Sequence, residues 1–491
     1  MRAASQKRSR AAVQGFAALG AAIIWLSPVR LSAQGASYPS APSAVSNPSA
    51  GAGAFSPQNP FSGSVPEGKV SPEPLPLSFK GAIELGLKNN LGLLLRDDNT
   101  LAARGEKWKE LSDLLPNLSG QVSENAVQDN LAARGLRFPG FPTIIGPYGF
   151  FDARVYLKQS LFNLDTWNRV RGATASEKAA EHNLKDARDL VVLAVGNAYL
   201  QALAGGARVE SVEAQVQTAQ ALSDKATDQQ DAGVVPAIDA LRAKVELQTR
   251  QQQLIVARND YAKQKLALVR AIGVPVGQEI VLTDRAPYEP LQAMGLEESL
   301  QRAYLSRSDY LAAVEQVRAA EKFRRAATAE HYPSLDFAAN YGDLGITPGQ
   351  SHGTFQVSGL LNIPIFQGGK THADVLQAEA QLRQSRQQLE NLRGQIEYEI
   401  RTALLDLASA SEQVEVARSS VDLAGQTLVQ SRDRFTAGVT DNLEVVQAQE
   451  ALAAANDNYI SSLYAHNLAK IELARAIGYA EEGVKQYLSG K

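Results

Sequence analysis

The sequence predicts a mainly helical protein that also carries membrane β-strands and is built from two similar halves. Three observations support this fold class. Two long blocks, residues 168–273 and 371–478, are rich in Ala, Gln, Glu, Leu and Arg and nearly free of Pro. Four shorter segments alternate apolar and polar residues with a period of two, as half-buried strands do. Landmarks of the first helical block recur in the second at a constant spacing, which indicates a duplication.

The duplication is visible in two pairs of short motifs. Ala232-Gly233-Val234 recurs as Ala437-Gly438-Val439, and Arg270-Ala271-Ile272-Gly273 recurs as Arg475-Ala476-Ile477-Gly478. Both pairs have the same offset, 205 residues, because 233 aligns with 438 and 273 with 478. A solenoid repeat would recur every few tens of residues. The chain therefore contains two copies of one large structural unit.

The N-terminal 35 residues are predicted to be a secretory signal peptide. A cluster of Arg and Lys precedes the uncharged apolar stretch Ala11–Leu26. This stretch is short for a membrane span, which needs about 20 apolar residues, so a cleaved signal is favoured over an anchor or a buried helix. Residues 36–76 are dominated by Ser, Pro, Ala and Gly, which predicts a disordered lead-in.

The composition argues against several kinds of site. The chain has no Cys, so it has no disulfide, no thiolate metal site and no acylated N-terminal Cys. A formal net charge of −3 gives no nucleic-acid signature. The five His are scattered without a pair at ligand spacing, and we expect them on surfaces or helix faces. No phosphate-binding Gly-rich loop follows a strand. We expect no catalytic, cofactor or metal site, and no enzyme.

Each helical block is predicted to form an antiparallel hairpin. The blocks are broken once each, at Gly233 and Gly438, where glycine can adopt the left-handed conformation that ends a helix. Helices of about 40 to 65 residues would be roughly 60–95 Å long and would form a rod or tube. In the second block, apolar residues recur at alternating spacings of three and four, as in a coiled-coil seam: Val445, Ala448, Leu452, Ala455, Tyr459 and Leu463.

The alternating segments are predicted to be transmembrane β-strands, at residues 118–126, 154–161, 335–341 and 355–359. Loops 128–148 and 342–353 would join them in pairs. A half-buried sheet of a soluble protein shows the same alternation, but the export signal favours the membrane. The smallest known barrels have about eight strands, so four strands per chain require oligomerisation, and a closed ring is favoured.

Four local patterns follow one another in the order typical of a known family. Leu115-Pro116-Asn117-Leu118 and Tyr332-Pro333-Ser334-Leu335 resemble its helix-to-strand junctions, where Pro ends a helix and starts an extended segment. Residues 363–369 resemble its exit from the last strand, and residues 435–445 resemble its hairpin tip. With these patterns, the chain from Leu77 onward resembles the TolC family of outer-membrane efflux proteins.

The resemblance implies a homotrimer in the cell outer membrane. Each chain would give four strands to a shared twelve-stranded barrel, and the helices would form a tunnel through the periplasm. Residues 77–290 and 291–480 would be the two TolC-like repeats, followed by a tail at 481–491. The sequence departs from the family where a Pro often precedes the rising helix of each half, because Asn89-Asn90-Leu91 and Arg307-Ser308-Asp309 contain none.

The function implied by the resemblance is a passive exit duct of a tripartite efflux or type I secretion system. Its partners would be a periplasmic adaptor (membrane fusion) protein and an inner-membrane pump of the RND or ABC type, which supplies the energy. The alternative is a secreted coiled-coil structural or adhesive protein without a pore. That alternative explains the helices and the signal, but not the alternating strands or the duplication.

The resemblance places the functional residues at the hairpin tips. Glu444 takes the position of an acidic residue that lines the periplasmic entrance, and Asp239 is its equivalent in the first half. Asp441 lies nearby, and Gln447 lies one turn beyond Glu444. Symmetry-related copies would form a charged ring; alternatively, these acids are solvated residues favoured by the helix dipole. Small apolar tip residues suit adaptor docking, or are simple turns: Gly233, Val234, Val235, Pro236, Gly438, Val439 and Thr440.

Overall fold

Long helices and a four-stranded sheet make up most of the computed structural model, which describes residues 60–284, 288–291, 294–437, 439–440, 442–481 and 483. The predicted signal peptide and residues 36–59 of the predicted lead-in lie outside the described residues. So do Gly438, Asp441 and most of the C-terminal tail.

Both halves of the chain have the same order of elements: two short helices, two strands, then two long helices. The helices of the first half are α1 Phe79–Asn89, α2 Leu91–Ser112, α3 Leu164–Asp231 and α4 Ala237–Ile272. Those of the second half are α5 Leu296–Ser306, α6 Ser308–Ala329, α7 Lys370–Thr436 and α8 Asn442–Ala476. The strands are β1 Leu75–Leu77, β2 Asn117–Asn130, β3 Ile144–Phe162, β4 Ile280–Leu282, β5 Ser334–Gly345 and β6 Ser351–Asn362. Helices α3 and α7 have 68 and 67 residues, and α4 and α8 have 36 and 35, so the halves match closely.

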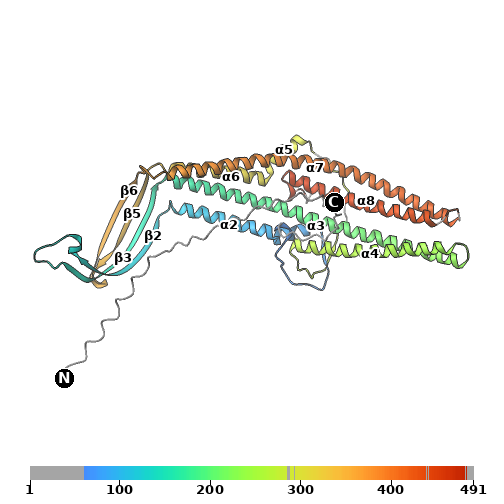
Figure 1. Ribbon diagram of the computed structural model, residues 1–491, viewed down its shortest axis with the longest axis horizontal. Coiled ribbons are helices and arrows are strands. Elements are labelled where there is room, and N and C mark those ends of the chain that lie inside the picture. The colour runs from blue at the N-terminus through green and yellow to red at the C-terminus, as the bar shows by residue number, and fades with distance from the viewer. Residues whose placement is uncertain are drawn as a thin grey trace, which may run out of the picture. The chain divides into compact units, whose positions relative to one another are not determined.

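The long helices pair as the hairpins α3–α4 and α7–α8, as predicted. Their turns lie at the end opposite the sheet of β2, β3, β5 and β6 (Figure 1). Helix α3 is begun by Asn163, whose side chain accepts hydrogen bonds from the amides of Asp165 and Thr166. It ends before Gly233, whose φ of 71° is the left-handed conformation predicted there.

Small and branched apolar residues join the two helices of the second hairpin near its turn. Val445 and Ala448 of the predicted seam are buried together with Leu428 and Phe435 of α7, and Leu222 of α3 joins them. Helix α3 also contains an apolar stretch that by length and composition could cross a membrane, but half of that stretch is buried against the rest of the chain. Packing against neighbouring helices therefore accounts for its apolar character.

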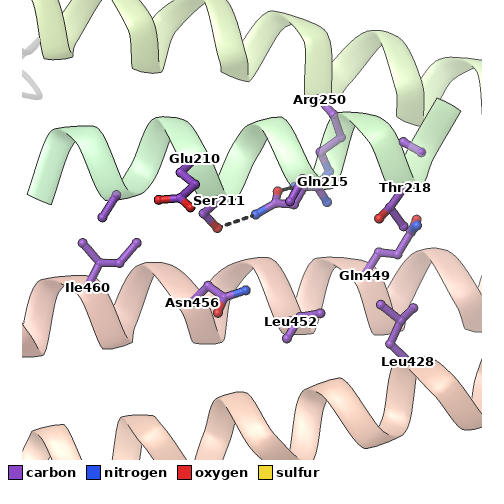
Figure 2. A pocket seen from close by; sticks show the side chains of 13 residues that line it. Glu210, Ser211, Gln215, Thr218, Arg250, Leu428, Gln449, Leu452, Asn456 and Ile460 are labelled. Carbon is purple, nitrogen blue, oxygen red and sulfur yellow. Dashed lines mark hydrogen bonds between the residues drawn. The ribbon is translucent and has the colours of Figure 1, made fainter. Parts of the chain in front are cut away.

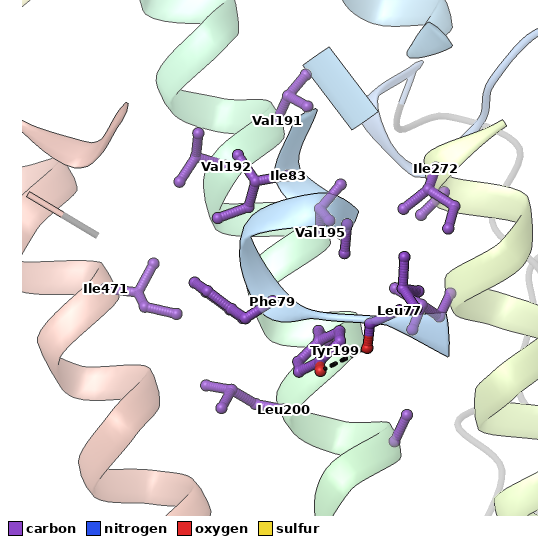
Figure 3. Close-up of a cluster of buried hydrophobic side chains, with 14 of the residues drawn as sticks. Leu77, Phe79, Ile83, Val191, Val192, Val195, Tyr199, Leu200, Ile272 and Ile471 are labelled. Atoms are coloured by element: carbon purple, nitrogen blue, oxygen red, sulfur yellow. Dashed lines mark hydrogen bonds between the residues drawn. The ribbon is translucent and has the colours of Figure 1, made fainter. Parts of the chain in front are cut away.

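A second apolar cluster lies where α1 packs against the long helices of both halves. The Phe79 and Tyr199 rings meet edge to face with centroids 5.3 Å apart. The Tyr199 hydroxyl lies 3.0 Å from the Leu77 carbonyl and 3.1 Å from the Asp284 carboxylate, so its one proton has two acceptors within reach. Ile83 of α1, Ile272 of α4 and Ile471 of α8 surround the pair (Figure 3). This cluster fixes α1 between the first and second repeats.

Residues 60–76 pack against the helices, so the prediction of a disordered lead-in is wrong for this stretch. The amides of Val65 and Glu67 donate to the carbonyls of Asn89 and Gly273 at 2.9 and 3.0 Å. Strand β1 pairs in parallel with β4, and Phe61 packs against the apolar cluster around Tyr199. The Ser- and Pro-rich composition hid this order, because the stretch is held mainly through its backbone and one aromatic side chain.

The sheet has the order β2-β3-β5-β6, and every pair in it is antiparallel. The four predicted strands are confirmed, but they are longer than predicted. The predicted loops at 128–148 and 342–353 shrink to about 131–143 and 346–350 because the strands continue into them. Pro116 and Pro333 lie between a helix end and a strand start, as predicted.

Asn90 and Arg307 occupy the helix junctions where the expected Pro is missing. Both residues are extended, with ψ of 128° and 118°, which is the conformation that a residue directly before a helix-opening Pro would adopt. The Asn90 side chain accepts from the Gly92 amide at 2.9 Å and donates to the Phe61 carbonyl at 2.7 Å. The Asn90 side chain therefore caps α2 and ties the junction to residue 61.

The Arg307 guanidinium is only 1 % exposed and joins three elements of the second half. It pairs with Asp309 at 2.6 Å and with Glu399 of α7 at 2.7 Å, and it donates to the Ala476 carbonyl at 3.2 Å. Burial opposes the ionised form of Asp309, but the hydrogen bonds and charge of Arg307 outweigh it and lower the pKa of that carboxyl. A buried pair completed in this way is costly to break from one side.

Candidate functional site

The hairpin tips expose several of the apolar residues predicted to dock a partner. Val234, in the turn between α3 and α4, and Val439, in the turn between α7 and α8, are each 69 % exposed. Pro236 is exposed, whereas Val235 and Thr440 are half-buried. The predicted tip residue Gly438 lies outside the described residues. Solvent-facing valines in matching places on both turns are consistent with a contact surface, although single exposed apolar residues are common.

Glu444 lies in the first turn of α8 and ties the two helices of its hairpin together. Its carboxylate accepts a hydrogen bond from the Thr440 hydroxyl at 2.5 Å. The Arg434 guanidinium, in the last turn of α7, lies 3.4 Å from the same carboxylate, and the Ser431 hydroxyl donates to it at 3.5 Å. The structure thus brings together two predicted site residues, Glu444 and Thr440, and adds Arg434, which the sequence analysis missed.

The signal for Arg434 was its place in the chain: a basic residue in the last turn of one helix, followed by an acidic residue in the first turn of the next. Each charge complements the dipole of its own helix. Two residues with this complementarity on either side of a tight turn face each other once the hairpin closes. The carboxylate is half-buried and is not simply solvated.

Asp239 lies in the first turn of α4, the position equivalent to Glu444 in the first hairpin. It is buried, at 8 % exposure, and its carboxylate lies 3.4 Å from the Arg242 guanidinium one turn along the same helix. Gln447 is exposed on α8. The two acidic residues therefore differ in setting, because Glu444 links across its turn whereas Asp239 pairs within its helix.

The sheet has one apolar face and one polar face. On the apolar face the strand register aligns Leu118, Leu157, Ala339 and Val357 across all four strands. The next row of the opposite face aligns Ser119, Tyr156, Asn340 and Gln356. This division follows from side chains alternating between the faces of a strand. A sheet of this kind fits between lipid on one side and water on the other.

Arg154 is the centre of a hydrogen-bonded cluster on the polar face. Its guanidinium pairs with Asp152 at 3.1 Å, donates to the Asn340 side chain at 2.7 Å, and donates to the Thr354 hydroxyl at 3.2 Å. Gly342 is its partner in the register, and a Cβ there would lie 2.8 Å from the Arg154 Cβ. Glycine at this position therefore leaves room for the arginine to cross to β6. This cluster was not predicted from the sequence, where its only signal was an Arg on the polar side of the alternation in β3.

No group of three or more His, Asp or Glu in the part of the chain that the structure describes is arranged to hold a metal ion. One histidine departs from expectation, because His466 is fully buried on α8 and not on a surface. Its ring lies 5.2 Å from the Tyr288 ring, and neither ring nitrogen has a hydrogen-bond partner among the described residues. Burial, with the Lys470 charge, lowers the pKa of His466 to about 4. It is a neutral, structural group.

Comparison with known families decides the identity of the chain. The family described as "Outer membrane efflux protein" matches residues 112–274 and 299–479, one segment in each repeat. The chain belongs to the outer membrane efflux protein family. This confirms the resemblance noted from the helix junctions and hairpin tips. It also confirms that the chain is not an enzyme, because the family consists of channels.

Curated relatives of the chain include two that are named for efflux or secretion. The chain is 25 % identical over 416 residues to the probable efflux pump outer membrane protein TtgC of Pseudomonas putida, covering 81 % of this chain and 82 % of the relative. It is 23 % identical to the alkaline protease secretion protein AprF of Pseudomonas aeruginosa, covering 68 % and 71 %. It is also 23 % identical to the outer membrane protein TolC of Escherichia coli, covering 67 % and 70 %.

Solved structures of outer-membrane proteins share the fold. The CmeC outer membrane channel of Campylobacter jejuni superposes with a TM-score of 0.70 at 17 % identity, covering 82 % of this chain and 86 % of that one. The outer membrane protein VceC of Vibrio cholerae superposes with a TM-score of 0.71 at 19 % identity, covering 82 % and 96 %. This outer membrane efflux protein is therefore an outer-membrane channel for efflux or secretion, and the alternative of a secreted protein without a pore is set aside.

Proposed function

We propose that three copies of the chain form one continuous duct from the periplasm to the exterior. The observation that carries this proposal is the four-stranded sheet, whose outer strands β2 and β6 each have one edge without a partner strand within the described chain. Lipid offers no hydrogen-bond partner, so a sheet in the membrane must close on itself. Pairing of β6 in one copy with β2 in the next closes the ring, and three copies give twelve strands.

The two faces of the sheet support the same arrangement. The row of Leu118, Leu157, Ala339 and Val357 would face lipid, and the polar row with Arg154 would face a water-filled lumen. The hairpins α3–α4 and α7–α8 follow the sheet along each half of the chain and would extend from it into the periplasm. Two hairpins from each of three copies would give six around one axis. The near-equal lengths of these hairpins in the two repeats fit such a ring.

The hairpin tips would form the periplasmic entrance. Three copies of Glu444 would bring three carboxylates toward the axis, each shared with Arg434 and Thr440 of its own chain. Asp239 would contribute equivalent positions from the first hairpin, with Asp441 and Gln447 nearby. We infer that this ring sets the ion preference of the entrance. The contacts of Glu444 with Arg434 and Thr440 would also hold the ends of α7 and α8 together at the turn of the second hairpin.

The exposed tip valines would dock a periplasmic adaptor protein. Val234 and Val439 place an apolar side chain on each of the six tips. Binding in apolar patches surrounded by polar residues is typical of transient contacts. The adaptor would join the duct to an inner-membrane pump of the RND or ABC type, and that pump would choose the substrate and supply the energy. The relatives' names support both an efflux and a secretion role.

The closed ring can be tested by crosslinking, because the natural chain contains no Cys. One cysteine is placed on β2 at Ser119 and one on β6 in turn at Thr354, Gln356 and Ser358, all on the polar face. At least one of the three pairs is expected to give a covalent trimer after mild oxidation in outer membranes. In the control, one cysteine replaces Leu118 on the apolar face and the other replaces Gln356 on the polar face. Because the two thiols lie on opposite faces, this pair should not crosslink. Only intrachain products, or dimers without trimers, would contradict the proposal.

A further inference from the structure

A cavity of about 400 Å³ lies between the two hairpins of one chain (Figure 2). Its walls come from all four long helices. Helix α3 forms one side, α8 forms the other, Arg250 of α4 closes part of it, and Leu428 of α7 closes the end near Gln449. The volume falls within the range of small-molecule sites, which is about 300–1,000 Å³. The tip residues and the sheet play no part in it.

One side chain in this cavity has an unmet hydrogen-bonding need. Gln449 is 8 % exposed, and its Oε1 atom has no hydrogen-bond partner among the described residues. The side chain extends from α8 toward Thr218 of α3, into the space between the helices (Figure 2). A buried amide oxygen without a donor is destabilising, and natural proteins rarely keep one without a reason. The cavity is therefore complementary to a molecule that brings an N–H or O–H group.

Two neighbouring polar side chains, Arg250 and Gln215, already have partners. The Arg250 guanidinium bonds Glu246 at 2.6 Å and Gln215 at 3.2 Å, and the Gln215 amide donates to Ser211 at 3.3 Å. Arg250 is buried and its charge is balanced by Glu246, so it does not call for an anion. Among the side chains that line the cavity, the Gln449 oxygen is a buried acceptor without a partner, which a ligand would satisfy.

The other end of the cavity carries a negative charge. Glu210 of α3 lines the cavity and its side chain is exposed, close to Ile460 of α8 (Figure 2). Eight residues separate Glu210 from Thr218 on α3, which corresponds to about 12 Å along a helix. Between these ends the walls are mainly apolar, with alanines of α3 facing Leu452 of α8. The site therefore combines a hydrogen-bond acceptor at one end, an apolar middle and a negative charge at the other end.

We propose that this cavity binds an elongated organic cation. Its cationic group lies at Glu210, its apolar body lies along the alanine and leucine walls, and an N–H group at its far end donates to Gln449 Oε1. Because the lining comes from both hairpins, a bound molecule contacts α3 and α8 together and fixes how the hairpins pack. The proposal concerns a single chain and does not depend on the trimeric duct.

The probe for this test is the fluorescent dication 4′,6-diamidino-2-phenylindole, which is elongated, aromatic and carries N–H groups at both ends. Its fluorescence is titrated against the full-length protein in a neutral detergent. We expect saturable binding of one molecule per chain, weakened about tenfold by Gln449→Leu, since one hydrogen bond to a buried acceptor corresponds to about that factor. Glu210→Gln should weaken binding at least roughly threefold at low salt.

Matched controls come from the same helices or charges outside the cavity. Gln413→Leu makes the same change at an exposed position of α7, and Glu412→Gln removes an exposed carboxylate of α7; neither should alter binding. Ala214→Leu places a larger side chain in the cavity and should abolish saturable binding. It tests the site independently if one of the other variants folds poorly. No saturable binding to the natural chain, or unchanged affinity in Gln449→Leu or Glu210→Gln, would overturn the proposal. Channel activity of the same preparation reports separately on the proposed duct.

Discussion

His466 should make the protein less stable as the pH falls toward 5. The ring is fully buried beside Tyr288, with Lys470 one turn along α8, so protonation would place a second cation in an apolar site without an acceptor. The pKa is lowered from 6.5 to about 4 by burial and by the Lys470 charge. The unfolded chain therefore binds this proton more readily than the folded chain, and the stability that His466 permits above pH 6.5 is lost progressively toward pH 4.

The magnitude follows from the pKa difference. At one pKa unit per 1.36 kcal/mol, the full effect is about 3 kcal/mol per chain, and about 2 kcal/mol of it falls between pH 7.5 and 5.0. For a chain of this length the entropy of unfolding is roughly 1 kcal/mol per kelvin. The expected change is therefore a fall in Tm of about 2 °C due to His466 alone.

The assay is thermal unfolding at pH 7.5 and 5.0, at one scan rate, for the natural protein and for His466→Leu. Leucine keeps an apolar side chain of similar size and cannot bind a proton. Other carboxyl groups titrate equally in both proteins, so the comparison isolates His466. The natural protein should lose about 2 °C more than the variant between the two pH values. Equal losses in the two proteins would refute the account of His466 as a buried, unpaired and neutral group.

Three further predictions concern the tips, the lumen and the junction between helices. Glu444→Gln should change single-channel conductance or block by divalent cations more than Gln447→Glu changes them; identical channels in both would rule out the entrance assignment. Arg154→Gln should shift reversal potentials in a salt gradient toward cations, whereas an unchanged selectivity would show that the cluster has no effect on the lumen. Gly478→Ala should lower stability by about 1–2 kcal/mol or more per chain, because φ is +75° and its Cβ would lie 2.7 Å from the Arg307 nitrogen. Gly425→Ala, an open helical position of α7, is its control and should not destabilise, as thermal unfolding would show.

The sequence was most informative where local pattern alone decides structure. The scarcity of Pro and the three-and-four spacing predicted the long hairpins. Period-two alternation predicted the four strands, and Pro116 and Pro333 marked the junctions before them. Gly233 marked a helix end because only glycine adopts a positive φ there at little cost. Each of these signals acts within a few residues, so it can be recognised without knowing what lies beside it.

Features that depend on residues far apart in the chain were missed. Arg307 reaches Glu399, 92 residues later, and links the start of α6 to α7. Arg154 reaches Thr354, 200 residues later, across a neighbouring strand. His466 is an ordinary helix residue by sequence and becomes buried only through packing. The order of residues 60–76 depends likewise on acceptors supplied by α1 and by the end of α4. These contacts are set by the tertiary fold and leave little local trace.

Recording single channels in planar lipid bilayers tests the central claim most directly. The purified protein should have the mass of a trimer in detergent. In the bilayer its conductance should appear and be lost in single steps, one for each trimer. A thiol-specific cationic reagent added to a single-cysteine variant at Gln356, on the polar face, should reduce the conductance in three equal steps. The same reagent on a cysteine at Val357, on the apolar face, should leave it unchanged. A monomer without conductance, or equal effects at the two positions, would contradict a shared barrel with this polar face toward the lumen.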